Sequence, residues 1–214
     1  QGHDTTVPVT VDDVIYHCRN VSRGLNRAFL VADMPFMSYS DPNQALENAV
    51  RLMQEGGAMM IKLEGGEDQI SIVEHLARHD IAVCAHLGLK PQSVHKIGGF
   101  RVQGRDENES RKMLKNAISL QNAGADIVLL ECVPNELGNS IKEELDIPVI
   151  GIGAGPNVDG QILVLYDILG ITHGTTPRFV KNFMIGNDSP IMAIKAYVQA
   201  VKNRDYPASE HCFS

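Results

Sequence analysis

The chain has 214 residues, and its 19 lysines and arginines against 26 aspartates and glutamates give a formal net charge of −7. Hydrophobic residues make up 43% and charged residues 21%, which is typical of one globular domain and unlike a disordered chain. The acidic balance argues against a nucleic-acid partner, and no run approaches the roughly 18 uncharged apolar residues of a membrane span, so we expect no membrane partner either.

The first part of the chain alternates amphipathic segments with short apolar runs. Thr10 stands three residues before Asp13, the spacing of a capping box, and apolar residues at helical spacing then predict a helix that ends at Gly24. Asp41-Pro42 is a typical start for the next helix. The elements predicted up to residue 85 are helices over 10–24, 41–56 and 70–77, and strands over 28–32, 59–63 and 81–85.

The alternation continues after a long irregular stretch. Residues 87–105 are rich in glycine, and an irregular stretch of that length inside a compact domain is more often functional than not. Beyond it we predict helices over 113–124, 137–145, 162–168 and 191–201, strands over 126–130 and 147–152, and a weak strand at 179–180. The five clear strands are continuously apolar, as in strands buried on both faces. Because each leads into a helix, the sequence predicts an α/β fold with a parallel sheet and right-handed crossovers.

The cysteines indicate the cellular compartment of the protein. Cys18, Cys84, Cys132 and Cys212 lie too far apart for a CxxC pair, and four in a chain of this length are not a disulfide scaffold. The sequence also starts without the charged and then apolar stretch of a secretory leader. We therefore expect a reduced, cytoplasmic protein.

Polar side chains stand at the ends of four predicted strands. They are Asp33, Glu64, His86 and Glu131. The carboxyl ends of parallel strands form the active face of α/β proteins, so these side chains should meet. Each acid on its own could simply cap the next helix. Three carboxylates at one rim are costly without a cation, which favours a functional cluster.

Lys62 interrupts an apolar run two residues before Glu64, so both side chains project from the same face of that strand. A lysine in such a run needs a partner. One interpretation is a structural ion pair between Lys62 and Glu64. The other is a lysine that binds a carboxylate or keto oxygen of a substrate, beside a carboxylate that helps to hold a metal.

The ligand types favour a hard cation. The histidines show no HxH or HExxH spacing, which argues against a zinc site, and the chain has no P-loop and no GxSxG motif. Oxygen ligands instead suit Mg²⁺, which takes a few carboxylates, water and the oxygens of the substrate. Such an ion beside a base fits removal of a proton next to a carbonyl group, with the metal stabilising the enolate.

Several long segments stand out along the chain: QGHDTTVPVT (1–10), ADMPFMSY (32–39), KLEGGE (62–67), HLGLKPQSV (86–94), LLECVP (129–134), IGIGAG (150–155), PRFVKNF (177–183) and the terminal EHCFS. Together they resemble the ketopantoate hydroxymethyltransferase family of the phosphoenolpyruvate/pyruvate barrel superfamily. The resemblance extends over essentially the whole chain, with the segments in the family order.

The resemblance implies a (β/α)8 TIM barrel, with residues 1–214 forming a single barrel domain that is incomplete at its N-terminus. Family members carry two further βα units upstream of QGHD. The strand just upstream of QGHD ends in a GDS-type motif, whose aspartate binds metal and whose serine binds substrate. We expect these first two units to be absent from the chain given, with the run at 179–180 as the eighth strand.

The resemblance also implies an activity. A hydroxymethyl group would pass from methylenetetrahydrofolate to α-ketoisovalerate through a Mg²⁺-stabilised enolate, giving ketopantoate for pantothenate and coenzyme A synthesis. Asp33 and Glu64 would bind Mg²⁺, and Asp33, Lys62 and His86 would bind or orient the substrate. Glu131 would be the general base. Bacterial members are decamers, so a homo-oligomer is expected.

Two alternatives stay open at this stage. A related Mg²⁺-dependent lyase or mutase acting on another α-keto acid would share the barrel and the enolate chemistry, but not the QGHD and PRFVKNF segments. An inactive or truncated barrel subunit would account for the absent upstream aspartate. The presence of Asp33, Lys62, Glu64 and Glu131 speaks against a degenerate barrel.

Overall fold

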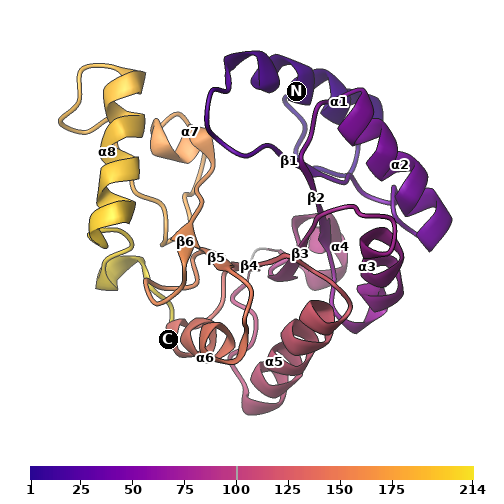
Figure 1. Cartoon of the computed structure of the whole chain (residues 1–214). Coiled ribbons are helices and arrows are strands. Elements are labelled where there is room, and N and C mark those ends of the chain that lie inside the picture. The colour runs from indigo at the N-terminus through magenta and orange to yellow at the C-terminus, as the bar shows by residue number, and fades with distance from the viewer. Residues whose placement is uncertain (100) are drawn as a thin grey trace.

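A computed structural model describes residues 1–99 and 101–214 as one curved sheet with helices along its outer side (Figure 1). Its parallel strands are hydrogen-bonded in chain order. They are β1 (Val31–Asp33), β2 (Met60–Glu64), β3 (Val83–Gly88), β4 (Ile127–Glu131), β5 (Val149–Ile152) and β6 (Gly160–Gln161). Because every strand runs the same way, all their carboxyl ends lie at one edge of the sheet.

Most of the helices lie between successive strands, and neighbouring helices pack against one another around the sheet. They are α1 (Val11–Gly24), α2 (Pro42–Gln54), α3 (Ile70–Ala77), α4 (Val94–Ile97), α5 (Glu107–Asn122), α6 (Asn135–Glu144), α7 (Leu165–Ile168) and α8 (Pro190–Asn203). Short 3₁₀ turns occur at Glu67–Gln69, Pro91–Ser93 and Ser209–His211. Figure 1 shows α1, α2, α3, α5 and α6 following one another along the convex side, with α8 beside α7 near the end of the chain.

Two helix starts confirm the capping signals in the sequence. The Thr10 side chain accepts a hydrogen bond from the backbone N–H of Asp13, whose carboxylate accepts one from the backbone N–H of Thr10. The carboxylate of Asp41 accepts the backbone N–H groups of Asn43 and Gln44 at the start of α2. Both caps satisfy N–H groups that have no partner inside the helix.

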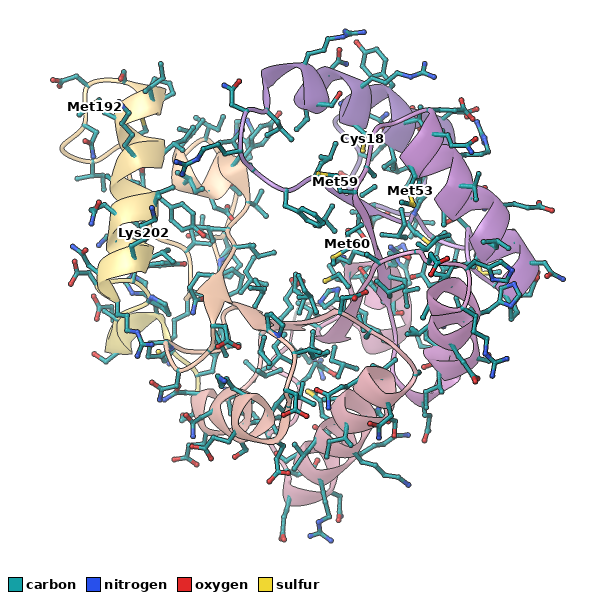
Figure 2. The ribbon with its side chains drawn as sticks, in the orientation of Figure 1. Cys18, Met53, Met59, Met60, Met192 and Lys202 are labelled. Carbon is teal, nitrogen blue, oxygen red and sulfur yellow. The ribbon has the colours of Figure 1, made fainter. Side chains whose placement is uncertain are left out.

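The strands alternate between two apolar layers. Ile61, Val128 and Leu130 belong to the larger core, which fills the space between the sheet and the helices. Met60 and Leu129, one position away, belong to a second cluster on the other face. Figure 2 labels Met60 on this inner side of the sheet. Because side chains alternate along a strand, residues 62, 64 and 131 also project from the inner face.

Some predicted boundaries differ from the structure. β1 begins at Val31 rather than at residue 28, and β3 continues to Gly88, into the stretch expected to be irregular. The same stretch contains the short helix α4. α5 begins at Glu107, six residues before the predicted start, because its first turns are polar and Asp106 caps it through the backbone N–H groups of Asn108 and Glu109.

The predicted strand at 179–180 is wrong. The backbone N–H of Val180 bonds the carbonyl of Pro177 at 3.0 Å, which makes this segment a turn. Phe179 is buried there against Gly153 and the ring of Phe213, so its apolar character reflects packing rather than sheet pairing. The last strand of the sheet is instead β6, which pairs with β5 and was not predicted.

Within the described ranges, β1 and β6 are the two edges of the sheet, which is therefore an open, curled half-barrel. A closed eight-stranded barrel is not seen in these residues. None of the described helices has the length and apolar character needed to cross a membrane.

Candidate active site

The predicted site residues come from the carboxyl ends of four neighbouring strands. The pairing register places Asp33 beside Lys62 and Glu64 beside His86. Glu131 is the last residue of β4, opposite Gly88 of β3. The strand-end argument is thus confirmed as a statement about position, since the structure brings these side chains together at one edge.

Lys62 is paired with Asp33. Its ammonium donates to both carboxylate oxygens of Asp33, at 2.8 and 2.7 Å. The lysine side chain is 13% exposed and the aspartate side chain 55% exposed. Burial by itself would lower the pKa of Lys62, but the charge and hydrogen bonds of Asp33 outweigh it, and the pKa is raised. Lys62 is therefore a charged ammonium, and its ion pair is with Asp33 rather than with Glu64.

His86 lies between two carboxylates. Its Nδ1 is 3.8 Å from Oε1 of Glu64, and its Nε2 is 3.3 Å from Oε2 of Glu131. Burial, followed by the charge of Lys62, lowers the pKa of His86 well below its usual value, so the ring is neutral. Neither ring nitrogen has a hydrogen-bond partner among the described residues. A neutral imidazole in this place can donate from one nitrogen and accept at the other.

The two flanking carboxylates have similar proton affinities. Burial raises the pKa of Glu64 and that of Glu131 to about 7 each, although the nearby charge of Lys62 lowers both. A carboxylate whose pKa lies near neutrality can take up and return a proton at physiological pH. Glu131 is also the more accessible of the two, because its side chain is 16% exposed and that of Glu64 is 4% exposed.

The structure adds two side chains that sequence reasoning missed. The hydroxyl of Tyr39 accepts the backbone N–H of Glu64 at 3.3 Å, and the backbone N–H of Gln92 donates to Oε2 of Glu64 at 3.2 Å. Tyr39 lies in a turn and Gln92 in the short 3₁₀ turn Pro91–Ser93, where no strand-end or helix-face rule applies. Their only signal was that both fall inside segments of the family resemblance.

A metal site would depend on few protein ligands. Within the described part of the chain, no group of three or more histidine, cysteine, aspartate or glutamate side chains is placed to hold an ion. Asp33 and Glu64 do provide two carboxylates on adjacent strands. Mg²⁺ is usually bound through one or two carboxylates, with water and substrate oxygens completing its octahedron. The donor set therefore fits Mg²⁺ and not a site built from protein ligands alone.

Comparison with known proteins decides the family. The model described as ketopantoate hydroxymethyltransferase matches residues 1–209. The chain belongs to this family. The 3-methyl-2-oxobutanoate hydroxymethyltransferase of Nitrosococcus oceani is 58% identical over 210 residues, covering 98% of this chain and 80% of that protein. The enzyme of the same name from Alkalilimnicola ehrlichii is 59% identical over 213 residues, covering 100% and 77%. The chain is accordingly a hydroxymethyltransferase.

Solved structures of lower identity share the fold of this ketopantoate hydroxymethyltransferase family member. A structure of oxaloacetate acetylhydrolase, in complex with the inhibitor 3,3-difluorooxalacetate, matches with a TM-score of 0.56 at 14% identity, covering 97% of this chain and 81% of that one. Phosphonopyruvate hydrolase matches with a TM-score of 0.52 at 14% identity, covering 92% and 66%. These matches show a shared fold.

The raised pKa of Glu131 predicts a cost in stability. Its carboxyl keeps a proton up to about pH 7, whereas an unfolded carboxyl with the ordinary pKa of 4.5 has released it. The folded state therefore binds more protons between pH 4.5 and 7, and this residue lowers the free energy of unfolding as the pH rises through that window. We expect Glu131→Gln to be more stable than wild type at pH 8, by on the order of 2 kcal/mol.

Urea denaturation at pH 4.5 and pH 8 checks this expectation. The advantage of Glu131→Gln should be small at pH 4.5 and fully present at pH 8. A variant that is equally stable or less stable than wild type at pH 8 would show that the glutamate carries no ionisation cost in the folded chain.

Proposed function

We propose that this chain forms ketopantoate from 3-methyl-2-oxobutanoate (α-ketoisovalerate) and methylenetetrahydrofolate, in pantothenate synthesis. The two relatives compared above carry the name of the acceptor. The observation that carries the proposal is the arrangement around His86: a carboxylate with a pKa of about 7 on one side and an ammonium held by Asp33 nearby. A base and a cation at the same edge of the sheet are what proton removal next to a ketone requires.

Glu131 is the base in this proposal. Its carboxylate takes the proton from the carbon beside the ketone, and the bonding electrons delocalise onto the keto oxygen. Lys62 offsets the negative charge that develops on that oxygen, because its ammonium is buried and stays protonated. Neutral His86, whose Nε2 is 3.3 Å from Glu131, lies beside that carboxylate without adding a competing charge.

The carbon–carbon bond forms in the next step. The enolised carbon attacks the methylene carbon carried by the folate. The two carbon–nitrogen bonds between that carbon and the folate break, and one water molecule supplies the hydroxyl group of the product and a proton for one folate nitrogen. The products are ketopantoate and tetrahydrofolate, with no change in total oxidation state. The proton held by Glu131 passes to the other folate nitrogen released in this step, which restores the base.

Asp33 and Glu64 would hold Mg²⁺ in this site. When bound, the ion supplies Lewis-acid polarisation of the keto and carboxylate oxygens, which acidifies the neighbouring C–H bond. Asp33 is suited to this role because its carboxylate is largely exposed and its described partner is the ammonium of Lys62. Glu64 is held in place by a backbone N–H group.

The proposal extends to the architecture around the site. The half-barrel of parallel strands is proposed to be part of a closed (β/α)8 barrel, since the relatives compared above are longer and this chain covers 80% and 77% of them. Assembly into a homo-oligomer, a decamer in the resemblance, and a cytoplasmic location belong to the same proposal. Sedimentation of the purified chain measures its oligomeric state directly.

Hydrogen exchange in heavy water tests the proposed chemistry. The chain should exchange the proton at carbon 3 of 3-methyl-2-oxobutanoate for deuterium without any folate, and added Mg²⁺ should accelerate the exchange. Net consumption of the keto acid should require methylenetetrahydrofolate. Folate-independent cleavage or rearrangement would favour a lyase or mutase, and absence of both exchange and turnover would favour an inactive barrel subunit.

A further inference from the structure

Glu64, Tyr39 and Gln92 are joined in a closed ring of hydrogen bonds. The backbone N–H of Glu64 donates to the Tyr39 hydroxyl at 3.3 Å, and that hydroxyl donates to Oε1 of Gln92 at 2.7 Å. The backbone N–H of Gln92 then donates to Oε2 of Glu64 at 3.2 Å. The ring therefore starts at the main chain of Glu64 and returns to its carboxylate.

A further bond ties this ring to the first strand. The side-chain amide of Gln92 donates to the backbone carbonyl of Met34 at 2.8 Å, immediately after β1. Tyr39 follows β1, Glu64 ends β2, and Gln92 follows β3, so the four bonds join the carboxyl ends of three strands. Both Tyr39 and Gln92 are only 8% exposed. Water is therefore a poor substitute for any partner removed from the ring.

The ring restricts where the Glu64 carboxylate can lie. One carboxylate oxygen accepts the backbone N–H of Gln92, and the other is 3.8 Å from the imidazole Nδ1 of His86. Without the side-chain bonds of Gln92, the loop that carries this N–H would be held less firmly to its neighbours. Residues that fix a ligating carboxylate typically change metal affinity or activity by roughly 10–100-fold when they are replaced.

We infer that Tyr39 and Gln92 are positioning residues, whose hydroxyl and carboxamide fix the Glu64 carboxylate where it contributes to Mg²⁺ binding. The inference rests on the proposed function, because it takes Glu64 as a metal ligand. Neither side chain needs to touch the substrate or the ion. Their effect passes through the backbone of Glu64 and the backbone N–H of Gln92.

Direct metal binding tests this inference without reference to turnover. Tyr39→Phe removes only the hydroxyl, and Gln92→Met removes the amide while keeping an unbranched side chain of similar length. Each should weaken binding of Mg²⁺ to the full chain, measured by calorimetry, by roughly 10–100-fold. Because the two side chains share one hydrogen bond, the double variant should lose less than the product of the two single losses.

Tyr206→Phe is the matched control. Tyr206 is also buried, and its hydroxyl donates to the backbone carbonyl of Phe179 at 2.5 Å, a bond that includes no member of the ring around Glu64. This variant should lose stability to a similar extent but bind Mg²⁺ as wild type does. Equal affinity in Tyr39→Phe and Tyr206→Phe, with both folded by circular dichroism, would overturn the inference.

The remaining outcomes are also decisive. If Tyr39→Phe does not fold, the comparison of Gln92→Met with Tyr206→Phe replaces it and is read in the same way. If the wild-type chain binds Mg²⁺ and exchanges the substrate proton while Gln92→Met binds equally well, only the positioning role fails. If wild type neither binds Mg²⁺ nor exchanges the proton, the proposed function fails, and the inference fails with it.

Discussion

Glu131→Gln should reduce turnover by on the order of 10²–10⁴-fold, because the amide cannot accept the substrate proton. The glutamine keeps the shape of the side chain and its place beside Nε2 of His86, 3.3 Å away in the wild-type chain. Substrate binding should therefore change little, and the loss should fall on kcat. The folate-free deuterium exchange should fall by a similar factor, since exchange requires the same proton removal.

The pH profile gives this prediction a second readout. With a pKa of about 7, Glu131 is protonated in acid, so activity of the wild-type chain should fall as the pH drops below neutrality. Glu136→Gln is the matched control, because Glu136 is exposed on the first turn of α6. It should keep wild-type exchange and turnover. Near-normal activity in Glu131→Gln would remove Glu131 from the role of base.

The stability and activity of Glu131→Gln should change in opposite directions. A buried carboxylate with a raised pKa costs stability when it ionises, whereas the neutral amide does not. A variant that is more stable at pH 8 and far less active would show that the folded chain holds this carboxylate at a cost for its chemistry. Loss of both properties would instead indicate a structural role.

Much of the fold could be predicted because its strands are buried on both faces. Continuous apolar runs of that kind placed β2 and β4 within one residue of their observed positions. Segments without an apolar signal were missed: β6, which has only two residues, and the polar first turns of α5. The false strand at 179–180 shows the converse error, since Phe179 is buried by a turn and a side-chain contact.

The candidate site could likewise be predicted only in part. The strand-end rule and the period of two along a strand predict that Lys62, Glu64 and Glu131 meet at one edge of the sheet. The hydrogen bond between Tyr39 and Gln92 joins residues 53 positions apart in two separate turns, and no sequence periodicity predicts such a contact. The pKa of about 7 at Glu131 could not be predicted from the sequence either, because it arises from burial by neighbours distant along the chain.

Lys62→Met should reduce kcat/KM by on the order of 10²–10³-fold, the usual loss when one group that stabilises a developing oxyanion is removed. Methionine fills the same narrow space, so packing at β2 should be largely kept. The substitution also removes the charge that lowers the pKa of Glu131, so that pKa should rise above about 7. The acid limb of the kcat/KM profile should consequently move to higher pH.

Two further variants separate charge from shape at this position. Lys62→Arg keeps a cation beside Asp33, so its acid limb should stay near that of wild type even if its different geometry lowers the rate. Lys112→Met removes an exposed lysine whose partner is Glu67 and should leave both rate and pH profile unchanged. An acid limb that stays in place in Lys62→Met would mean that the ammonium does not act on the base. A full rate in that variant would mean that the ammonium does not act on the substrate, and the pair with Asp33 would then be purely structural.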